Sequence, residues 1–154
     1  MTIPASQTDP APLTLTVFGP MRVLVAGQPL PRLHSRKSFW LLALLALRRG
    51  GPVEREWLAS MLWPDADQDQ AFASLRPVLS DLRRALGAEG ARLLSPSRRV
   101  LSLEISGTDV DVLAFDAAIV RKTPESLALA VRLYTGPLLE GCAEEWAPQE
   151  RNAR

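Results

Sequence analysis

The sequence has few of the side chains that build metal centres and disulfide frameworks. Its 154 residues include one cysteine, Cys142, and one histidine, His34. One thiol cannot close a disulfide within the chain, and one thiol with one imidazole is too few for a cysteine- or histidine-based zinc site. Glycine-rich phosphate loops, nucleophile elbows and paired-histidine motifs are also missing. We therefore expect no cofactor and no enzymatic activity, with Cys142 a packed or partly exposed thiol and His34 a loop or capping residue.

Long hydrophobic segments are missing as well. The longest apolar run covers residues 39–47, whereas a helix needs about 20 apolar residues to cross a bilayer. Residues 1–12 have neither a basic start nor an apolar stretch, which argues against a signal peptide, and we expect them to form a disordered lead-in. These features predict a cytoplasmic protein without a membrane partner.

An excess of charge of one sign is nearly absent from the whole chain, which has a formal net charge of +1. The charges are nevertheless unevenly distributed. Residues 1–103 contain 13 basic and 8 acidic groups, whereas residues 104–154 contain 5 basic and 9 acidic groups. A basic segment of the kind that binds nucleic acid is therefore followed by an acidic one.

Hydrophobic periodicity predicts an α+β fold for residues 13–105. Alternating apolar residues with Gly-Pro breaks indicate short antiparallel strands, and three-and-four spacing indicates helices. The predicted elements are strands near 13–18 and 21–25, an edge strand near 30–33, helices near 35–49, 54–63 and 67–86, and a hairpin formed by 92–95 and 99–105. A small sheet, three helices and a C-terminal hairpin are the elements of a winged helix-turn-helix.

The third predicted helix has one apolar face and one basic face. A turn of 100° per residue places Arg76, Ser80 and Arg84 opposite the apolar face and Arg83 on its flank. Because the major groove admits one helix, side chains on such a face can reach base edges, and we expect Arg76, Ser80, Arg83 and Arg84 to read or position the major groove. The alternative is an ordinary solvated helix face. Asp81, at the edge of this face, would repel phosphate unless it pairs with Arg84, three residues further along the helix.

Two further basic pairs are candidates for contact with nucleic acid. Arg98 and Arg99 lie at the tip of the predicted hairpin, where the alternative is a polar turn. Arg36 and Lys37 lie at the start of the first helix, where positive charge is unfavourable for the helix dipole. A phosphate facing that helix end would explain them, and a plain surface role is the alternative.

After residue 107 the sequence becomes helical and more acidic. Amphipathic helices are predicted near 112–120 and 125–134, and a last helix is predicted from about residue 144 to the end. Three aspartates near the first of these helices, Asp109, Asp111 and Asp116, are interpreted as helix caps rather than as a metal site.

The order and spacing of several short motifs resemble one bacterial family. Residues 13–105 resemble the winged-helix domain of the OmpR/PhoB type, and more closely its version in the antibiotic-regulatory proteins (the SARP family). The matching pieces are LTVFGP at 15–20, SRKS at 35–38, LWPD at 62–65, LR at 75–76 and LSDLRRALG at 79–87. Residues 109–154 resemble the start of that family's bacterial transcriptional activator domain, through DVLAF at 111–115 and YTGPLLEG at 134–141.

The resemblance implies a sequence-specific DNA-binding transcription regulator, and specifically an activator. The partners it implies are double-stranded DNA, RNA polymerase, and a second copy of the chain bound through the C-terminal helices, with the protein on the nucleoid when bound. The family's activator domain has several more helices, so residues 109–154 are expected to be a partial domain. Pro77 departs from the family pattern, because a polar or basic residue is usual there, and a proline can kink the helix that presents Arg76.

A different class of function is also compatible with the sequence. The winged helix could be a protein-interaction module with weak or lost DNA binding, acting through its C-terminal helices. Pro77 and the acidic C-terminal segment favour this alternative.

Overall fold

The computed structural model describes residues 11–30 and 35–152, so His34 and most of the predicted lead-in lie outside it. The elements in the first part of the chain are β1 (Leu13–Thr16), β2 (Arg22–Val25), β3 (Gln28–Pro29), α1 (Lys37–Leu47), β4 (Val53–Glu54), α2 (Arg55–Leu62), α3 (Gln68–Leu86) and the 3-10 helix η2 (Gly87–Arg92). The remaining elements are β5 (Leu93–Ser97), β6 (Val100–Leu103), β7 (Thr108–Val110), α4 (Asp111–Arg121), α5 (Pro124–Leu133) and α6 (Ala147–Asn152).

The strands form two small sheets, which confirms the predicted α+β class. The first has the order β3-β2-β1-β7, and the second has the order β4-β6-β5. β1 and β2 pair antiparallel as predicted, with Leu15 opposite Val23. The sequence pattern did not predict β7, which pairs parallel to β1 and places Val110 beside Leu15. The predicted edge strand near 30–33 falls mostly on residues outside the structure's described ranges.

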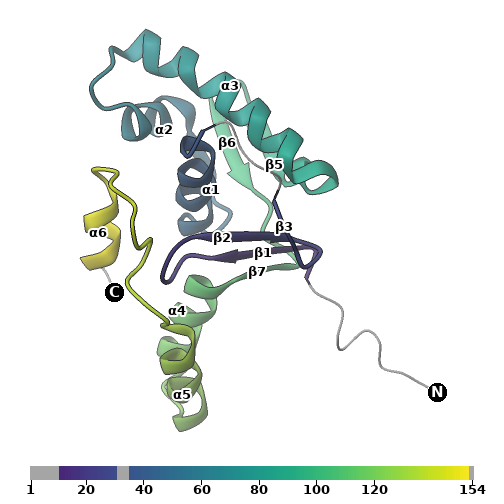
Figure 1. Ribbon diagram of the computed structural model, residues 1–154, viewed down its shortest axis with the longest axis vertical. Helices are drawn as coiled ribbons and strands as arrows, with labels where there is room; N and C mark the ends of the chain where they lie inside the picture. The colour runs from purple at the N-terminus through teal and green to yellow at the C-terminus, as the bar shows by residue number, and fades with distance from the viewer. Residues whose placement is uncertain (1–10, 31–34, 153–154) are drawn as a thin grey trace, which may run out of the picture.

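α1 lies at the centre of the fold (Figure 1). Every residue from Leu41 to Leu47 is buried, because this helix is apolar almost all the way round. α3 packs its apolar face against the core through Leu75, Leu79 and Leu82, each at most 3% exposed. A fully buried leucine contributes about 1.5–3 kcal/mol to stability, so this face fixes the rotation of α3 and directs its opposite face outward.

α3 continues through Pro77 without a break. It begins after Asp67, whose side chain accepts a hydrogen bond from the Gln70 amide at 2.8 Å, and it ends at Leu86 before Gly87. Pro77 is exposed. The residues on either side of the proline therefore belong to one helix and share its outward face.

The C-terminal segment returns to the core, and its last helix is shorter than predicted. α6 begins at Ala147 rather than near residue 144. The preceding backbone runs instead beside the end of β1, where Leu138 bridges Phe18 and the Leu139 amide donates to the Val17 carbonyl at 2.6 Å. Residues such as Trp146, 3% exposed, then join the same hydrophobic core as α1.

Asp111 connects the start of α4 to the end of β1. Its carboxylate accepts hydrogen bonds from the amides of Val17 at 2.9 Å and Phe18 at 3.0 Å, and from that of Val112. Burial raises the pKa of Asp111, although these amides favour its charged form. The predicted cap position is wrong, because the residue that precedes α4 is Val110 and Asp111 is the first residue of the helix. The Asp111 carboxylate accepts the first-turn amide of Val112 and also joins α4 to the end of β1.

Two absences concern the described residues alone. Within residues 11–30 and 35–152, no group of three or more His, Cys, Asp or Glu side chains could hold a metal ion. Over the same ranges, no helix is long and apolar enough to cross a membrane.

Replacing Asp111 with alanine should destabilise the fold by about 2 kcal/mol, because the amides of Val17 and Phe18 would lose their acceptor. Chemical denaturation measures this change. Asp109→Ala is the matched control, since Asp109 is exposed and should change the free energy of unfolding by less than about 0.5 kcal/mol. Equal effects of the two variants would contradict the structural role of Asp111.

Replacing Pro77 with alanine should stabilise the protein by about 2 kcal/mol. A proline inside a helix costs about 3 kcal/mol, and the gain is reduced by about 1 kcal/mol because alanine makes the unfolded chain more flexible. Pro64→Ala serves as the control, because Pro64 is exposed and lies outside the helices. A lower melting temperature for the Pro77 variant would contradict this expectation.

Candidate nucleic-acid interface

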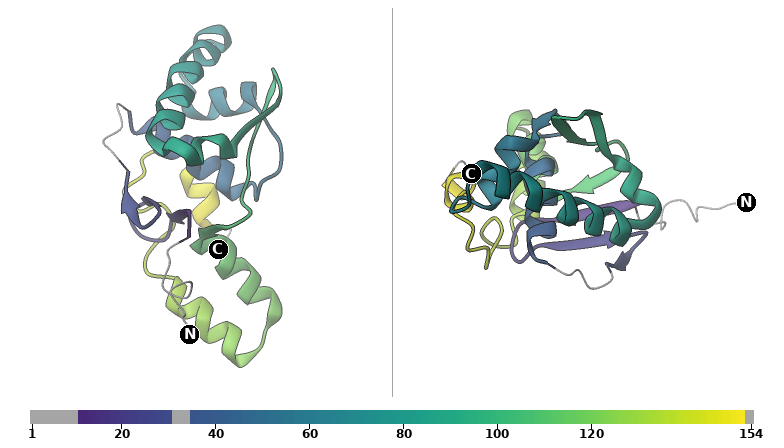
Figure 2. Two further views of the ribbon diagram at one scale, coloured as in Figure 1. Left: turned by 90° about the vertical axis from the view of Figure 1, so that its right-hand side faces the viewer. Right: turned by 90° about the horizontal axis from the view of Figure 1, so that it is seen from above.

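The outward face of α3 presents the predicted residues Arg76, Ser80 and Arg84, and all three are exposed. The predicted pairing of Asp81 with Arg84 is confirmed, with the Arg84 Nη1 atom 3.8 Å from the Asp81 Oδ1 atom. The Arg84 side chain is 70% exposed, so this pair is weak and leaves the guanidinium accessible. α3 lies at one end of the molecule, and the α4–α5 hairpin extends from the other (Figures 1 and 2).

Arg83 lies on the flank of α3 and reaches the wing, which is the β5–β6 hairpin. Its Nη2 atom donates to the Leu93 carbonyl at 2.8 Å and to the Ser95 hydroxyl oxygen at 3.1 Å. Arg55, the first residue of α2, donates to the same hydroxyl oxygen at 3.0 Å. Its backbone amide also donates to the Arg99 carbonyl at 2.8 Å. These bonds join α2, α3 and the wing at one place.

Positive charge accumulates at this junction. The pKa of Arg55 is lowered first by burial and then by the positive charges of Arg83 and Arg76. Among the described residues, the salt bridges join other groups and none includes these three arginines. The Arg55 Nε atom is buried and has no hydrogen-bond partner. We call Arg55, Arg76 and Arg83 the arginine cluster.

Sequence reasoning missed Arg55, although a signal for it was present. Arg55 lies between Glu54 and Glu56 at the start of a helix, where a positive charge is unfavourable for the helix dipole. The two neighbouring glutamates fit the ordinary pattern of a helix start and so conceal this signal in the sequence.

The tip of the wing carries Arg98 and Arg99, both exposed as predicted for a hairpin. The Arg99 amide donates to the Ser97 hydroxyl oxygen at 3.2 Å. β5 is one of the two edge strands of its sheet, and its pairing with β6 is irregular between Leu94 and Ser97. The wing residues at this irregularity are therefore open to a partner molecule.

The structure does not bring Lys37 to the arginine cluster. Its Nζ atom donates to the Leu62 carbonyl and to Glu144, with 3.0 Å to the Glu144 Oε2 atom, and lies 5.8 Å from the centre of the Trp63 ring. Lys37 thus links α1 to the C-terminal segment. Arg36 is exposed, and a phosphate contact by this pair stays a prediction.

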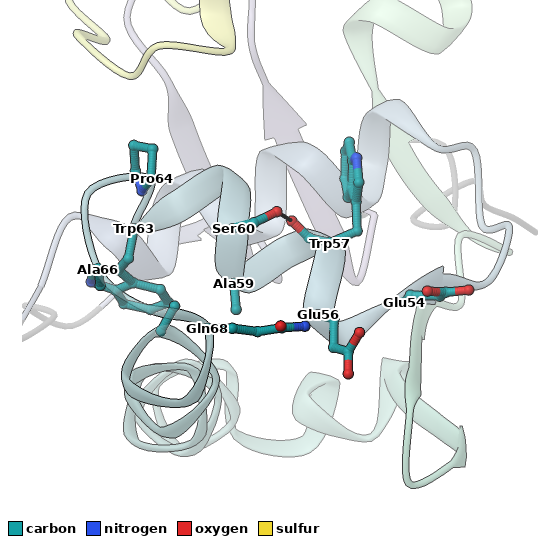
Figure 3. A pocket seen from close by; sticks show the side chains of 10 residues that line it. Glu54, Glu56, Trp57, Ala59, Ser60, Trp63, Pro64, Ala66 and Gln68 are labelled. Carbon is teal, nitrogen blue, oxygen red and sulfur yellow. Dashed lines mark hydrogen bonds between the residues drawn. The ribbon is translucent and has the colours of Figure 1, made fainter.

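A pocket of about 470 Å³ lies between α2 and the start of α3. Glu54 and Glu56 line one end of it, and Trp63 lies toward the other (Figure 3). Its acidic end would repel phosphate, so we place the edge of the candidate interface on this side of α2.

Comparisons with known proteins agree with this architecture. The chain is similar to the transcriptional regulatory protein EmbR of Mycobacterium tuberculosis and of Mycobacterium bovis, with 27% identity over 142 residues. The matched region covers 83% of this chain and 36% of the relatives, so the chain spans about a third of their length. No protein-family model matches the chain.

A solved structure gives the same result for the fold. The structure of M. tuberculosis EmbR in complex with a low-affinity phosphopeptide matches with a TM-score of 0.73 and 24% identity, over 92% of this chain and 41% of that one. The described residues therefore adopt a winged-helix fold. The chain is homologous to EmbR, a regulator of the antibiotic-regulatory (SARP) type, which confirms the resemblance found in the sequence.

The partner found for Lys37 leads to a stability prediction. A double-mutant cycle with Lys37→Met and Glu144→Gln should give a coupling energy of about 1 kcal/mol in unfolding experiments, because both side chains are partly buried. The Arg49–Asp116 pair is the matched control, since the Arg49 side chain is 63% exposed, and its coupling should be below about 0.5 kcal/mol. A zero coupling for Lys37 and Glu144 would contradict their structural role.

Proposed function

We propose that this chain is the DNA-binding part of a transcription regulator, and specifically of an activator. In this proposal α3 enters the major groove of double-stranded DNA, and the β5–β6 wing contacts the backbone beside it. The observation that carries the proposal is the arginine cluster, in which α2 and α3 bring three guanidinium groups together beside the wing. The similarity to EmbR supports a role in transcription.

In this proposal the outward face of α3 and the tip of the wing contact different parts of the DNA. Arg76, Ser80 and Arg84 project from the outward face of α3, and hydroxyl and guanidinium donors are suited to base edges in the major groove. Arg98 and Arg99 at the wing tip supply positive charge for phosphates. Because neutralised phosphates release counterions, affinity should fall steeply with salt concentration.

A separate surface, on α4 and α5, favours contact with protein. α4 and α5 expose apolar side chains, including Val120 at 78% and Val131 at 76%. A groove of about 460 Å³ between these helices is lined by Phe115, Ile119, Leu127, Ala130, Val131 and Tyr134. This surface supports the alternative of a protein-interaction module, and it is where we place the predicted contacts with a second copy or RNA polymerase.

The DNA-binding proposal is tested with duplexes that the chain selects from a random pool. In fluorescence anisotropy, changing both Arg76 and Arg84 to alanine should weaken binding to the selected duplex by about 10²-fold, since each good base contact contributes about 1–3 kcal/mol of discrimination. The matched control changes two exposed arginines of α4 and α5, Arg121 and Arg132, to alanine and should bind like the unaltered chain.

Circular dichroism should show that both double variants keep their helices. Unchanged affinity of the Arg76 and Arg84 variant would contradict the assignment of α3 as the reading helix. If the unaltered chain is not retained by heparin or random duplex DNA at physiological salt, the protein-interaction module becomes the better description.

A further inference from the structure

We propose that Arg55 and Arg83 clamp one phosphate of the DNA backbone, with the Ser95 hydroxyl holding the two guanidinium groups together and donating to the same phosphate. This inference rests on the proposed function and states which arginines contact the DNA backbone and which contact the bases. It moves Arg83 from the base-reading set to the backbone, and it adds Arg55, which the sequence pattern did not single out.

The geometry of the Ser95 hydroxyl carries the first step. Its oxygen accepts one hydrogen bond from Arg55 at 3.0 Å and one from Arg83 at 3.1 Å. A hydroxyl has two acceptor lone pairs and one proton, so both lone pairs are used and the proton is left to donate. The described residues offer this proton no acceptor, and because Ser95 is exposed, an oxygen atom that approaches from solvent beside the two guanidinium groups can accept it.

The charge of the site gives the second step. Two guanidinium groups that share one neutral oxygen repel each other, and Arg76 adds a third positive charge nearby. A phosphodiester anion would supply both the missing negative charge and acceptors for the planar forks of two arginines.

The position of the site indicates backbone rather than base. Arg83 is held on the flank of α3 by the Leu93 carbonyl of the wing, whereas Arg76 and Arg84 are exposed on the outward face. When a helix occupies the major groove, the phosphates lie along the groove edges, between the helix and a flanking wing. The Ser95 site lies between these two elements.

The test compares Arg55→Gln with Arg132→Gln, a matched change at an exposed arginine of α5. Binding is measured by anisotropy over a range of KCl concentrations, on a duplex selected by the unaltered chain and on a scrambled duplex. We expect Arg55→Gln to bind both duplexes roughly tenfold more weakly, as for a lost charged hydrogen bond. The slope of log affinity against log salt should become shallower by about 1, because one phosphate is no longer neutralised.

Two more variants separate charge from geometry. Arg55→Lys should keep the salt slope of the unaltered chain while binding both duplexes more weakly, because lysine retains the charge but loses the fork. Ser95→Ala should weaken binding to both duplexes by a smaller factor without changing the slope. Because Arg55→Lys keeps the charge, it also tests the clamp if Arg55→Gln fails to fold.

Several outcomes would overturn the clamp. One is an Arg55→Gln variant with the affinity and salt slope of Arg132→Gln, and another is a loss confined to the selected duplex, which would indicate a base contact. In both cases the unaltered chain still binds DNA and the proposed function stands. If the unaltered chain binds neither duplex, the proposed function fails and the clamp fails with it.

Discussion

The burial of α1 is the constraint on which the rest of the structure depends. A helix that is apolar almost all round has no face to give to water, so other elements must cover it on every side. α2 and α3, both sheets and the C-terminal segment join it in one hydrophobic core. The outward faces of α3 and the wing are thus consequences of covering α1, because each of these elements has only one apolar face to turn inward.

The sequence predicted the local elements well and the long-range contacts poorly. The limits of α3 followed from Asp67, the apolar spacing and Gly87, all of which act within a few residues of the helix. β7 and the bonds of Asp111 to Val17 and Phe18 could not be predicted in this way, because they join residues more than 90 positions apart. The predicted start of α6 was wrong for the same reason, since residues 137–140 pair with residues 17–19 just after β1 and Glu144 pairs with Lys37.

The candidate site shows the same difference between features set by local sequence and features set by long-range contacts. Exposure of Arg76, Ser80 and Arg84 followed from helical periodicity, because these residues lie opposite the buried leucines. The arginine cluster did not, since it needs Arg55 of α2, Arg83 of α3 and Ser95 of the wing in one place, and no local pattern relates those three positions. Lys37 gives a second example, because its hydrogen bonds to Glu144, 107 residues later, cannot be read from the pattern of its own helix end.

The anchoring of the α4–α5 hairpin has a mechanical consequence. Its first end continues from β7 and is fixed through Asp111, and its second end leads into residues that pair with Phe18 and pack beside α1. An element attached to the same core at both ends is held rigidly and cannot move as a flexibly tethered domain would. A protein bound to the exposed side of α4 and α5 would therefore be held in one orientation relative to α3, because both elements are attached to the same core.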